Sequence, residues 1–107
     1  MFDVQTALRA LVDRGGSDLH LKVSTPPLFR INGVLGSYPD DPQLSEADTE
    51  RTLHELLHDP TKLQEFADEH EVDFSFEIPE VARYRVNAFR QRGLISLACR
   101  AIPHKIS

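Results

Sequence analysis

Apolar residues recur at the start of the chain with the spacing of a single helix face. Their separations of three and four positions are those of an amphipathic helix packed against a core, and the residues are Val4, Ala7, Leu8, Leu11 and Val12. Asp3 lies just before this run, where its side chain can cap the first turn. Gly15 or Gly16 is expected to end the helix in the left-handed conformation.

Alternation of apolar and polar residues replaces the helical spacing from Ser17 onward. The segment SDLHLKV, residues 17–23, alternates in this way and predicts a half-buried strand. LFRI and VLG then flank Asn32-Gly33, the strongest short signal for a two-residue hairpin turn. The sequence therefore predicts three strands in succession, the last two joined as a hairpin.

The middle of the chain returns to the helical pattern after a loop, SYPDDPQ. Ser45 and Asp48 have the spacing of a capping box, and the helix that they open is expected to continue through Leu53 to Leu57. Asp59-Pro60 places proline at the first position of a second helix. That helix is expected to run through Leu63, Phe66 and Ala67.

The last third of the chain predicts three more strands. The first strand carries alternating apolar residues, namely Val72, Phe74, Phe76 and Ile78. The other two, residues 82–91 and 94–102, are joined around Arg92-Gly93. The order of elements indicates an α+β domain, in which an antiparallel β-sheet is packed by an N-terminal helix and a central helix pair.

The hairpin around Arg92-Gly93 determines which residues face one another if its turn has two residues. Gln91 then faces Leu94 next to the turn. Counting back along both strands brings Arg85 opposite Arg100. Two like charges placed directly opposite cost of the order of 0.2–1 kcal/mol. Solvent can tolerate such a pair, but an anion between the two guanidinium groups would make it favourable.

The charge distribution favours an anionic partner for this hairpin. The formal net charge is −5, yet residues 40–80 carry −12 and residues 81–107 carry +6. Five of the nine arginines lie in residues 83–100, a stretch without any carboxylate. The planar guanidinium of arginine binds phosphate oxygens in pairs and stays charged at cellular pH.

Asp73 and Glu77 offer these arginines a purely structural alternative. Both lie on the polar face of the strand at 72–78, beside Arg83 or Arg85 if that strand pairs with the next one. If these carboxylates neutralise the arginines, or if the arginines are simply solvated, no phosphate role is required.

Composition and motifs limit the other functions of the chain. Its 40% hydrophobic and 27% charged residues are ordinary for a soluble domain, and no stretch approaches the length of a membrane span. Cys99 is the only cysteine, so an internal disulfide is impossible. No lysine precedes a serine or threonine, so the phosphate-binding loop G-x-x-x-x-G-K-[ST] is missing. The segment alone is therefore not expected to hydrolyse ATP.

Residues 54–58 form a literal H-E-x-x-H sequence. On one helix, His54 and His58 could share a metal ion, with Glu55 as general base. A zinc enzyme also needs a third ligand, and the sequence fixes the position of none of the candidates, Glu69, His70 and Glu77. With the leucines of this helix buried, both histidines would point to solvent. A metallohydrolase is therefore a remote alternative, and no metal is expected.

Five motifs occur in order along the chain and carry a family resemblance. They are SDLHL (17–21), PPLFRINGVL (26–35), DFSFEIP (73–79), ARYRVNAFRQRG (82–93) and CRAIP (99–103). Together they resemble the N-terminal, PAS-like domain of the hexameric ATPases of type IV pili and type II secretion. The variants FSFEIP and RVNAFRQRG are most similar to the PilT-type branch, which retracts pili in twitching motility.

The resemblance implies a longer parent protein. Residues 1–102 would form the PAS-like domain, and residues 103–107 would begin a linker to a RecA-like ATPase domain that is absent here. The parent would be a cytoplasmic ATPase, peripheral to the inner membrane through the pilus machine, that uses ATP and Mg. Its expected partners are its own ATPase domain, neighbouring subunits of a homohexamer and the inner-membrane platform of the pilus, and no nucleic acid.

The resemblance also implies roles for individual residues. Arg85 in ARYRVN and Arg100 in CRAIP match positions that reach the nucleotide phosphates in that family and help couple hydrolysis to domain rotation. Weaker candidates for the same contact are Arg83, Arg90 and Arg92. Asp18 and His20, both in SDLHL, are expected at a domain interface or in a hydrogen-bond network. No catalytic residue is expected within this segment.

Two other classes of function remain open at this point. A free-standing PAS-like sensor would need a roomy internal cavity, and the sequence carries no cofactor signature. A nucleic-acid-binding module could use the basic hairpin, but the acidic middle block opposes it, as does the presence of only two tyrosines and no tryptophan for base stacking. The sequence does not decide whether an arginine serves its own or a neighbouring subunit's nucleotide, or whether the pilus is retracted or extended.

Overall fold

The computed structural model describes residues 1–38 and 41–103 of the chain. Its elements are α1 (Val4–Asp13), β1 (Gly16–Leu21), β2 (Leu28–Ile31), β3 (Val34–Gly36), α2 (Glu46–Leu56), α3 (Pro60–Glu69), β4 (Glu71–Ile78), β5 (Ala82–Gln91) and β6 (Leu94–Pro103). The predicted order of helices and strands is therefore confirmed. Part of the predicted loop, residues 39–40, and most of the predicted linker, residues 104–107, lie outside the described residues.

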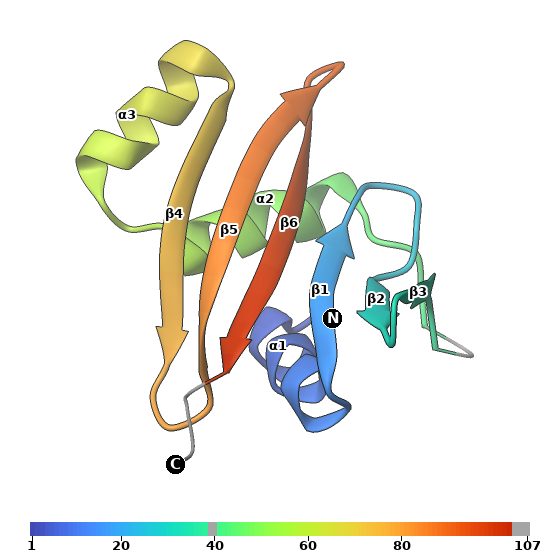
Figure 1. Ribbon diagram of the computed structural model, residues 1–107. Coiled ribbons are helices and arrows are strands. Elements are labelled where there is room, and N and C mark those ends of the chain that lie inside the picture. Colours follow the sequence, from blue (N-terminus) through green and yellow to red (C-terminus); the bar gives the residue numbers. More distant parts are fainter. Residues whose placement is uncertain (39–40, 104–107) are drawn as a thin grey trace.

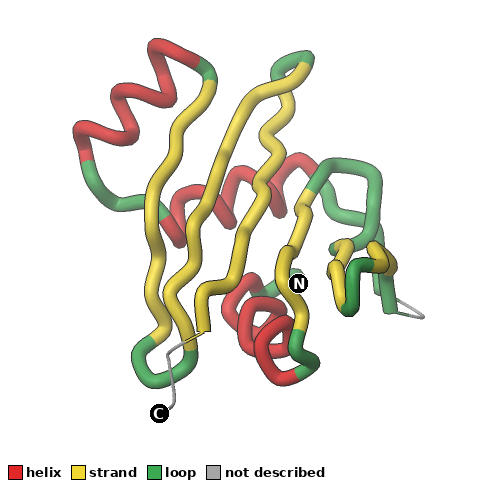
Figure 2. The backbone as a smooth tube through the Cα atoms, viewed as in Figure 1, coloured by secondary structure: helices red, strands yellow, loops and turns green. Residues whose placement is uncertain are grey.

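The six strands form one antiparallel sheet in the order β3-β2-β1-β6-β5-β4. Helices α1 and α2 lie against one face of this sheet, and α3 lies beside its β4 edge (Figures 1 and 2). No helix of the described chain covers the opposite face, which is called the open face below (Figure 1). The predicted α+β class is confirmed, with only α2 of the central pair crossing the sheet.

Each helix begins where the sequence provides a cap. Asp3 accepts a hydrogen bond from the Gln5 amide at 3.3 Å, which satisfies one free N–H group of the first turn of α1. At α2, the capping box of Ser45 and Asp48 is complete, with bonds of 2.8 and 3.1 Å. The hydrogen bond from the Ser45 amide lowers the pKa of the Asp48 carboxyl, and a hydrogen bond from the Arg51 side chain lowers it further.

Two left-handed turns fix the register of the two hairpins. Asn32-Gly33 has φ values of 52° and 79°, and Arg92-Gly93 has 55° and 81°. Positive φ at both central positions is typical of the two-residue turn that matches the twist of adjoining strands. Gln91 accordingly faces Leu94, and Arg85 faces Arg100. The predicted register of this hairpin is confirmed.

The core lies between the sheet and the helices α1 and α2, and α3 adds the buried Phe66 to it. Tyr84 is buried in it, and its hydroxyl donates a hydrogen bond to the carbonyl oxygen of Leu8 at 2.8 Å. Desolvation raises the pKa of the Tyr84 hydroxyl to about 12, and it raises the pKa of the buried Cys99 thiol to about 12. No helix of the described chain is long and apolar enough to cross a membrane.

The first strand ends earlier than predicted, while β6 reaches Pro103, one residue further than predicted and into the expected linker. The alternating segment at residues 17–23 forms a strand only as far as Leu21, and Val23 instead makes an isolated parallel bridge with Leu44. Ser24 has a positive φ of 68°, so the chain turns there and leaves the sheet before the Pro26-Pro27 pair. Alternation of side chains continues past the point where this backbone stops pairing.

Candidate anion site on the open face

Four charged side chains lie in a line across the open face. Asp18 of β1 pairs in register with Arg30 of β2 on one side and with Arg100 of β6 on the other. Arg100 in turn pairs with Arg85 of β5. Residues directly opposite on neighbouring strands project to the same face of a sheet. The four residues are therefore neighbours, and we call them the arginine row.

Asp18 is the only carboxylate of the arginine row, and it contacts two of the arginines. Its Oδ2 lies 3.4 Å from Nε of Arg30, and its Oδ1 lies 3.5 Å from Nε of Arg100. The Asp18 side chain is 15% exposed. Its Oδ1 is buried and makes no hydrogen bond within the described chain, so the Arg100 charge is its main compensation.

Arg100 and Arg85 remain open to solvent. The Arg100 side chain is 72% exposed although it contacts Asp18. Arg85 is exposed and, within residues 1–38 and 41–103, has no ion pair or hydrogen bond through its side chain. The arginine row thus has three guanidinium groups against one carboxylate, a formal charge of +2. Such a concentration of guanidinium groups on an uncovered surface is suited to binding phosphate oxygens.

The alternative partners Asp73 and Glu77 do not neutralise Arg85. The Asp73 carboxylate accepts a hydrogen bond from the side-chain amide of Asn87 at 3.0 Å. Glu77 lies opposite Arg83 in the register of β4 and β5, two residues away from Arg85 along the strand. Across from Arg85 on β4 the structure places the neutral Ser75.

Arg90 and Arg92 do not join the arginine row. Arg90 lies on the helix-covered face, where its Nη1 is 3.4 Å from Oε1 of Glu50 and donates to the Gly93 carbonyl at 3.0 Å. Arg92 sits in the turn of the β5–β6 hairpin, seven residues from Arg85, or roughly 23 Å along an extended strand. Of the three weaker candidates, only Arg83 lies on the same face of β5 as Arg85, two residues away from it.

His20 lies beside Asp18 on the open face. Its Nε2 is 3.9 Å from Oδ2 of Asp18, which is too far for a hydrogen bond. The same nitrogen is buried and has no hydrogen-bond partner within the described chain. His20 therefore makes no hydrogen bond through Nε2 within the described residues, and its part in a hydrogen-bond network stays a prediction. A role at a domain interface stays a prediction.

The H-E-x-x-H sequence does not form a metal site. Helix α2 ends at Leu56, and Leu57 is extended with a ψ of 112°, so His54 and His58 do not share a helix face. Pro60 opens α3, and the chain must turn between the two helices to place it there. Among the residues that the structure describes, no three His, Cys, Asp or Glu side chains are close enough to hold a metal.

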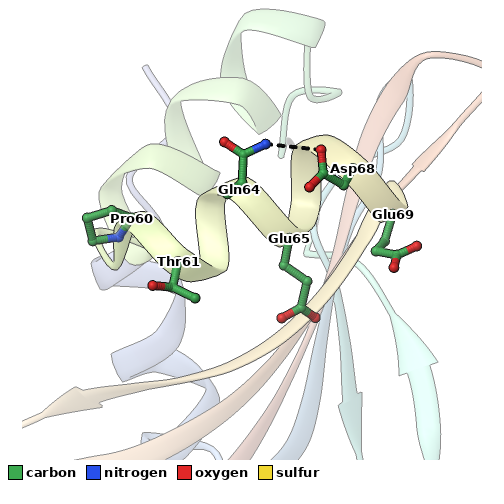
Figure 3. A pocket seen from close by; sticks show the side chains of 6 residues that line it. All are labelled: Pro60, Thr61, Gln64, Glu65, Asp68 and Glu69. Carbon is green, nitrogen blue, oxygen red and sulfur yellow. Dashed lines mark hydrogen bonds between the residues drawn. The ribbon is translucent and has the colours of Figure 1, made fainter.

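Two hollows on the surface, both away from the arginine row, are lined mainly by acidic residues. A hollow on the outer side of α3 is lined by the carboxylates of Glu65, Asp68 and Glu69, and the side-chain amide of Gln64 donates to Asp68 at 3.0 Å (Figure 3). A second hollow of about 720 Å³ adjoins α1. Its charged lining residues are Asp3, Arg14, Asp41 and Asp48. Negative charge predominates in both, so neither suits a phosphate group.

Comparison with known proteins identifies the domain. Over 104 residues, 97% of its length, the chain is 35% identical to the type IV pilus retraction ATPase PilT of Pseudomonas aeruginosa and 32% identical to the type IV pilus ATPase PilU of the same organism. It also superposes over its full length on a crystal structure of the pilus retraction motor PilT with bound ADP, with a TM-score of 0.88 and 31% identity. No family model matches the chain.

The chain is a homologue of the N-terminal domain of PilT-type secretion ATPases. This agrees with the fold and with the resemblance carried by the five motifs. The chain spans 30% of the length of PilT and 27% of the length of PilU. Two of these relatives are named as type IV pilus ATPases, and a third is a twitching motility protein of Neisseria gonorrhoeae.

Arg30 is the member of the arginine row that the sequence did not single out. It belongs to PPLFRINGVL, and strand alternation alone puts it opposite in direction to the buried Phe29. Its contact with Asp18 depends on β2 pairing with β1 in the register Asp18↔Arg30, after an irregularity near Ser17. That shift in register leaves no mark in the residue pattern. Arg30 and Arg100 thus contact the same carboxylate, Asp18, although Arg30 lies outside the basic hairpin.

Proposed function

We propose that the chain is the N-terminal, nucleotide-contacting and regulatory module of a hexameric pilus-retraction ATPase. Residues 1–102 form this module, and the chain from Pro103 onward begins the connection to a RecA-like domain that binds ATP and Mg. Arg85 and Arg100 contact the phosphates of that ATP, with Arg83 in a supporting position. The parent acts on the cytoplasmic side of the inner membrane, in contact with neighbouring subunits and the pilus platform rather than with nucleic acid.

One observation carries this proposal. In a homologue of PilT, Arg85 and Arg100 are paired across β5 and β6 on the face that no described helix covers. The pairing of like charges is unfavourable by some tenths of a kcal/mol unless an anion lies between them. An ATP phosphate delivered by another domain would provide that anion. The ADP bound to the similar PilT structure is consistent with a nucleotide in the parent protein.

The chemical contribution of the arginines is electrostatic. Negative charge spreads over the oxygens of the transferred phosphoryl group during ATP hydrolysis, and positioned guanidinium groups stabilise it. The module contributes no phosphate-binding loop, so the Mg ion and the attacking water must be held by the adjoining domain. Because the arginines and the ATP would belong to different domains, a change in the domain arrangement would switch their contact on or off. This provides the regulatory part of the proposal.

The test is ATP turnover in the full-length protein. Arg85→Ala and Arg100→Ala should each lower turnover, by up to about 10³-fold if the arginine acts in the transition state. Arg92→Ala is the matched control because it removes the same charge from the same hairpin outside the arginine row. It should leave turnover within about twofold of the wild type. Unchanged turnover in both test variants would refute phosphate contact, provided circular dichroism shows that they remain folded.

A further inference from the structure

Asp18 is a carboxylate that lies between two arginines, in a site that is suited to an anion. We infer that Asp18 is a positioning residue, which holds Arg100 by its Nε and thereby directs the terminal amino groups toward the phosphate. The inference rests on the proposed function, because it concerns how the same arginines reach their ligand. It adds Asp18 and Arg30 to the residues on which phosphate contact depends.

The contacts of the two arginines to Asp18 share one feature. Both use the inner nitrogen, Nε, and each meets a different oxygen of the same carboxylate. Arg30 is also anchored at its far end, where Nη1 donates to the Gly33 carbonyl at 3.1 Å. Arg100 has no such second contact within the described chain, so its two terminal amino groups remain available. Arg30 is thus fixed at two points, and Arg100 is held at one.

These contacts form a connected series from the β2–β3 turn to the hairpin. The Gly33 carbonyl accepts a hydrogen bond from Arg30, and Arg30 forms an ion pair with Asp18. Asp18 forms a second ion pair with Arg100, which lies opposite Arg85. Ordering a long side chain costs rotamer entropy, and arginine is among the residues that lose the most. An arginine already held at Nε loses less of this freedom when its terminal amino groups bind an anion. Asp18 would therefore increase the affinity of the arginine row for phosphate.

Simple electrostatics gives the opposite expectation. Asp18 carries one negative charge into a site for a negative ligand, so removing that charge should strengthen anion binding. The positioning role requires instead that removing it weakens binding, because Arg100 loses its anchor. The two explanations differ in the sign of the effect, and this makes the role of Asp18 measurable.

The experiment titrates the 107-residue chain with inorganic tripolyphosphate at low ionic strength, with amide chemical shifts of β5 and β6 as the readout. Asp18→Asn keeps the shape of the side chain and removes its charge. It should weaken binding at least about threefold. Asp73→Asn is the matched control, since Asp73 lies on the open face and contacts no arginine of the row. The Asp73→Asn variant should bind tripolyphosphate as well as the wild type or slightly more tightly. If Asp18→Asn also binds tripolyphosphate more tightly than the wild type, the positioning role is wrong.

A double substitution tests whether Asp18 acts through Arg100. In an Arg100→Ala background, Asp18→Asn should no longer weaken binding and should strengthen it slightly, because only the charge effect remains. A purely structural role would weaken binding equally in both backgrounds and would overturn the inference. The Nε–H signal of Arg100 gives an independent readout, since it should be ordered in the wild type and averaged in Asp18→Asn.

The outcome separates this inference from the proposed function. If Arg85→Ala and Arg100→Ala leave tripolyphosphate affinity unchanged, the arginine row does not bind phosphate and both ideas fail. If these substitutions weaken binding and Asp18→Asn strengthens it, the phosphate site stands and only the positioning role fails. Thermal unfolding of Asp18→Asn checks that the variant is folded at the temperature of the titration.

Discussion

Strand β5 carries arginines on both of its faces, and their surroundings differ completely. On the helix-covered face, Arg90 meets Glu50, donates to the Gly93 carbonyl and lies 5.2 Å from the centre of the Phe66 ring. On the open face, Arg85 has no side-chain partner within the described chain. The same residue type is therefore fully engaged on one side of the strand and available on the other.

The difference shows which arginines belong to the fold and which are free for a ligand. Arg90 joins the β5–β6 hairpin to α2 and α3, through contacts that combine an ion pair with a cation–π interaction. Arg85 and Arg100 join no helix to the sheet, and Arg100 touches only the row's own carboxylate. Substitutions on the two faces should therefore change different properties of the protein.

The largest effect on stability is expected from substituting a core residue on the helix-covered face of the sheet. Leu97 is buried in the core cluster, on the side of β6 opposite to Arg100 in the strand alternation. Leu97→Ala should lower the free energy of unfolding by about 2–5 kcal/mol, through lost burial and the cavity that remains. Urea denaturation followed by circular dichroism measures this. A loss below about 1 kcal/mol would contradict the assignment of the core to this face.

Alkaline pH should also destabilise the helix-covered face. Burial raises the pKa of the Cys99 thiol from 9.0 to about 12 and the pKa of the Tyr84 hydroxyl from 10.0 to about 12. Folding therefore favours the neutral forms of both groups. Their contribution to the free energy of unfolding is fully present below pH 9 and is lost as the pH rises toward 12. Unfolding free energy should fall by about 1.4 kcal/mol per pH unit and per group in this range.

Cys99→Ala provides the control for this pH dependence. The variant lacks the thiol, so its unfolding free energy should change little between pH 9 and pH 10 and should fall only once Tyr84 begins to contribute. The comparison uses the slope against pH, because the alanine itself lowers stability at every pH. Parallel curves for wild type and variant would contradict a buried, neutral Cys99.

A smaller effect is expected for Arg90. Arg90→Met keeps an apolar contact with Phe66 and removes the ion pair with Glu50, so the unfolding free energy should fall by about 1 kcal/mol. Affinity for tripolyphosphate should stay within about twofold of the wild type, since Arg90 lies on the far face from the arginine row. A marked loss of anion binding would show that the two faces are coupled.

The smallest effect on stability is expected for Arg85. Arg85→Ala removes no described contact, so the unfolding free energy should remain within about 0.5 kcal/mol of the wild type. Relief of repulsion from Arg100 could even produce a small gain. Tripolyphosphate binding should nevertheless weaken clearly in the same variant. A destabilisation above about 1 kcal/mol would show that Arg85 is part of the fold.

The sequence was sufficient to predict the elements and the register of the hairpin. Caps at Asp3, Ser45 and Asp59 and glycine turns at Gly33 and Gly93 are local signals, and local interactions determine these features. The pairing of Arg85 with Arg100 followed from the turn alone. The candidate site was therefore predictable to the extent that it lies within one hairpin.

The remaining parts of the site depend on contacts between distant segments. Arg90 was named as a weaker candidate for the same contact as Arg85, yet it has the parity of Tyr84 in β5 and lies on the opposite face, where its partner Glu50 is forty positions away in the sequence. Arg30 reaches Asp18 only through the pairing of β2 with β1. Neither partner follows from a local pattern, and both were missed.

The most direct test is a structure of the full-length protein with a non-hydrolysable ATP analogue. We expect a terminal amino group of Arg85 or Arg100 to lie within about 3.2 Å of a phosphate oxygen, with Arg100 still in contact with Asp18 through Nε. A nucleotide-bound structure with both guanidinium groups far from every phosphate, or with the open face turned away from the nucleotide, would contradict it.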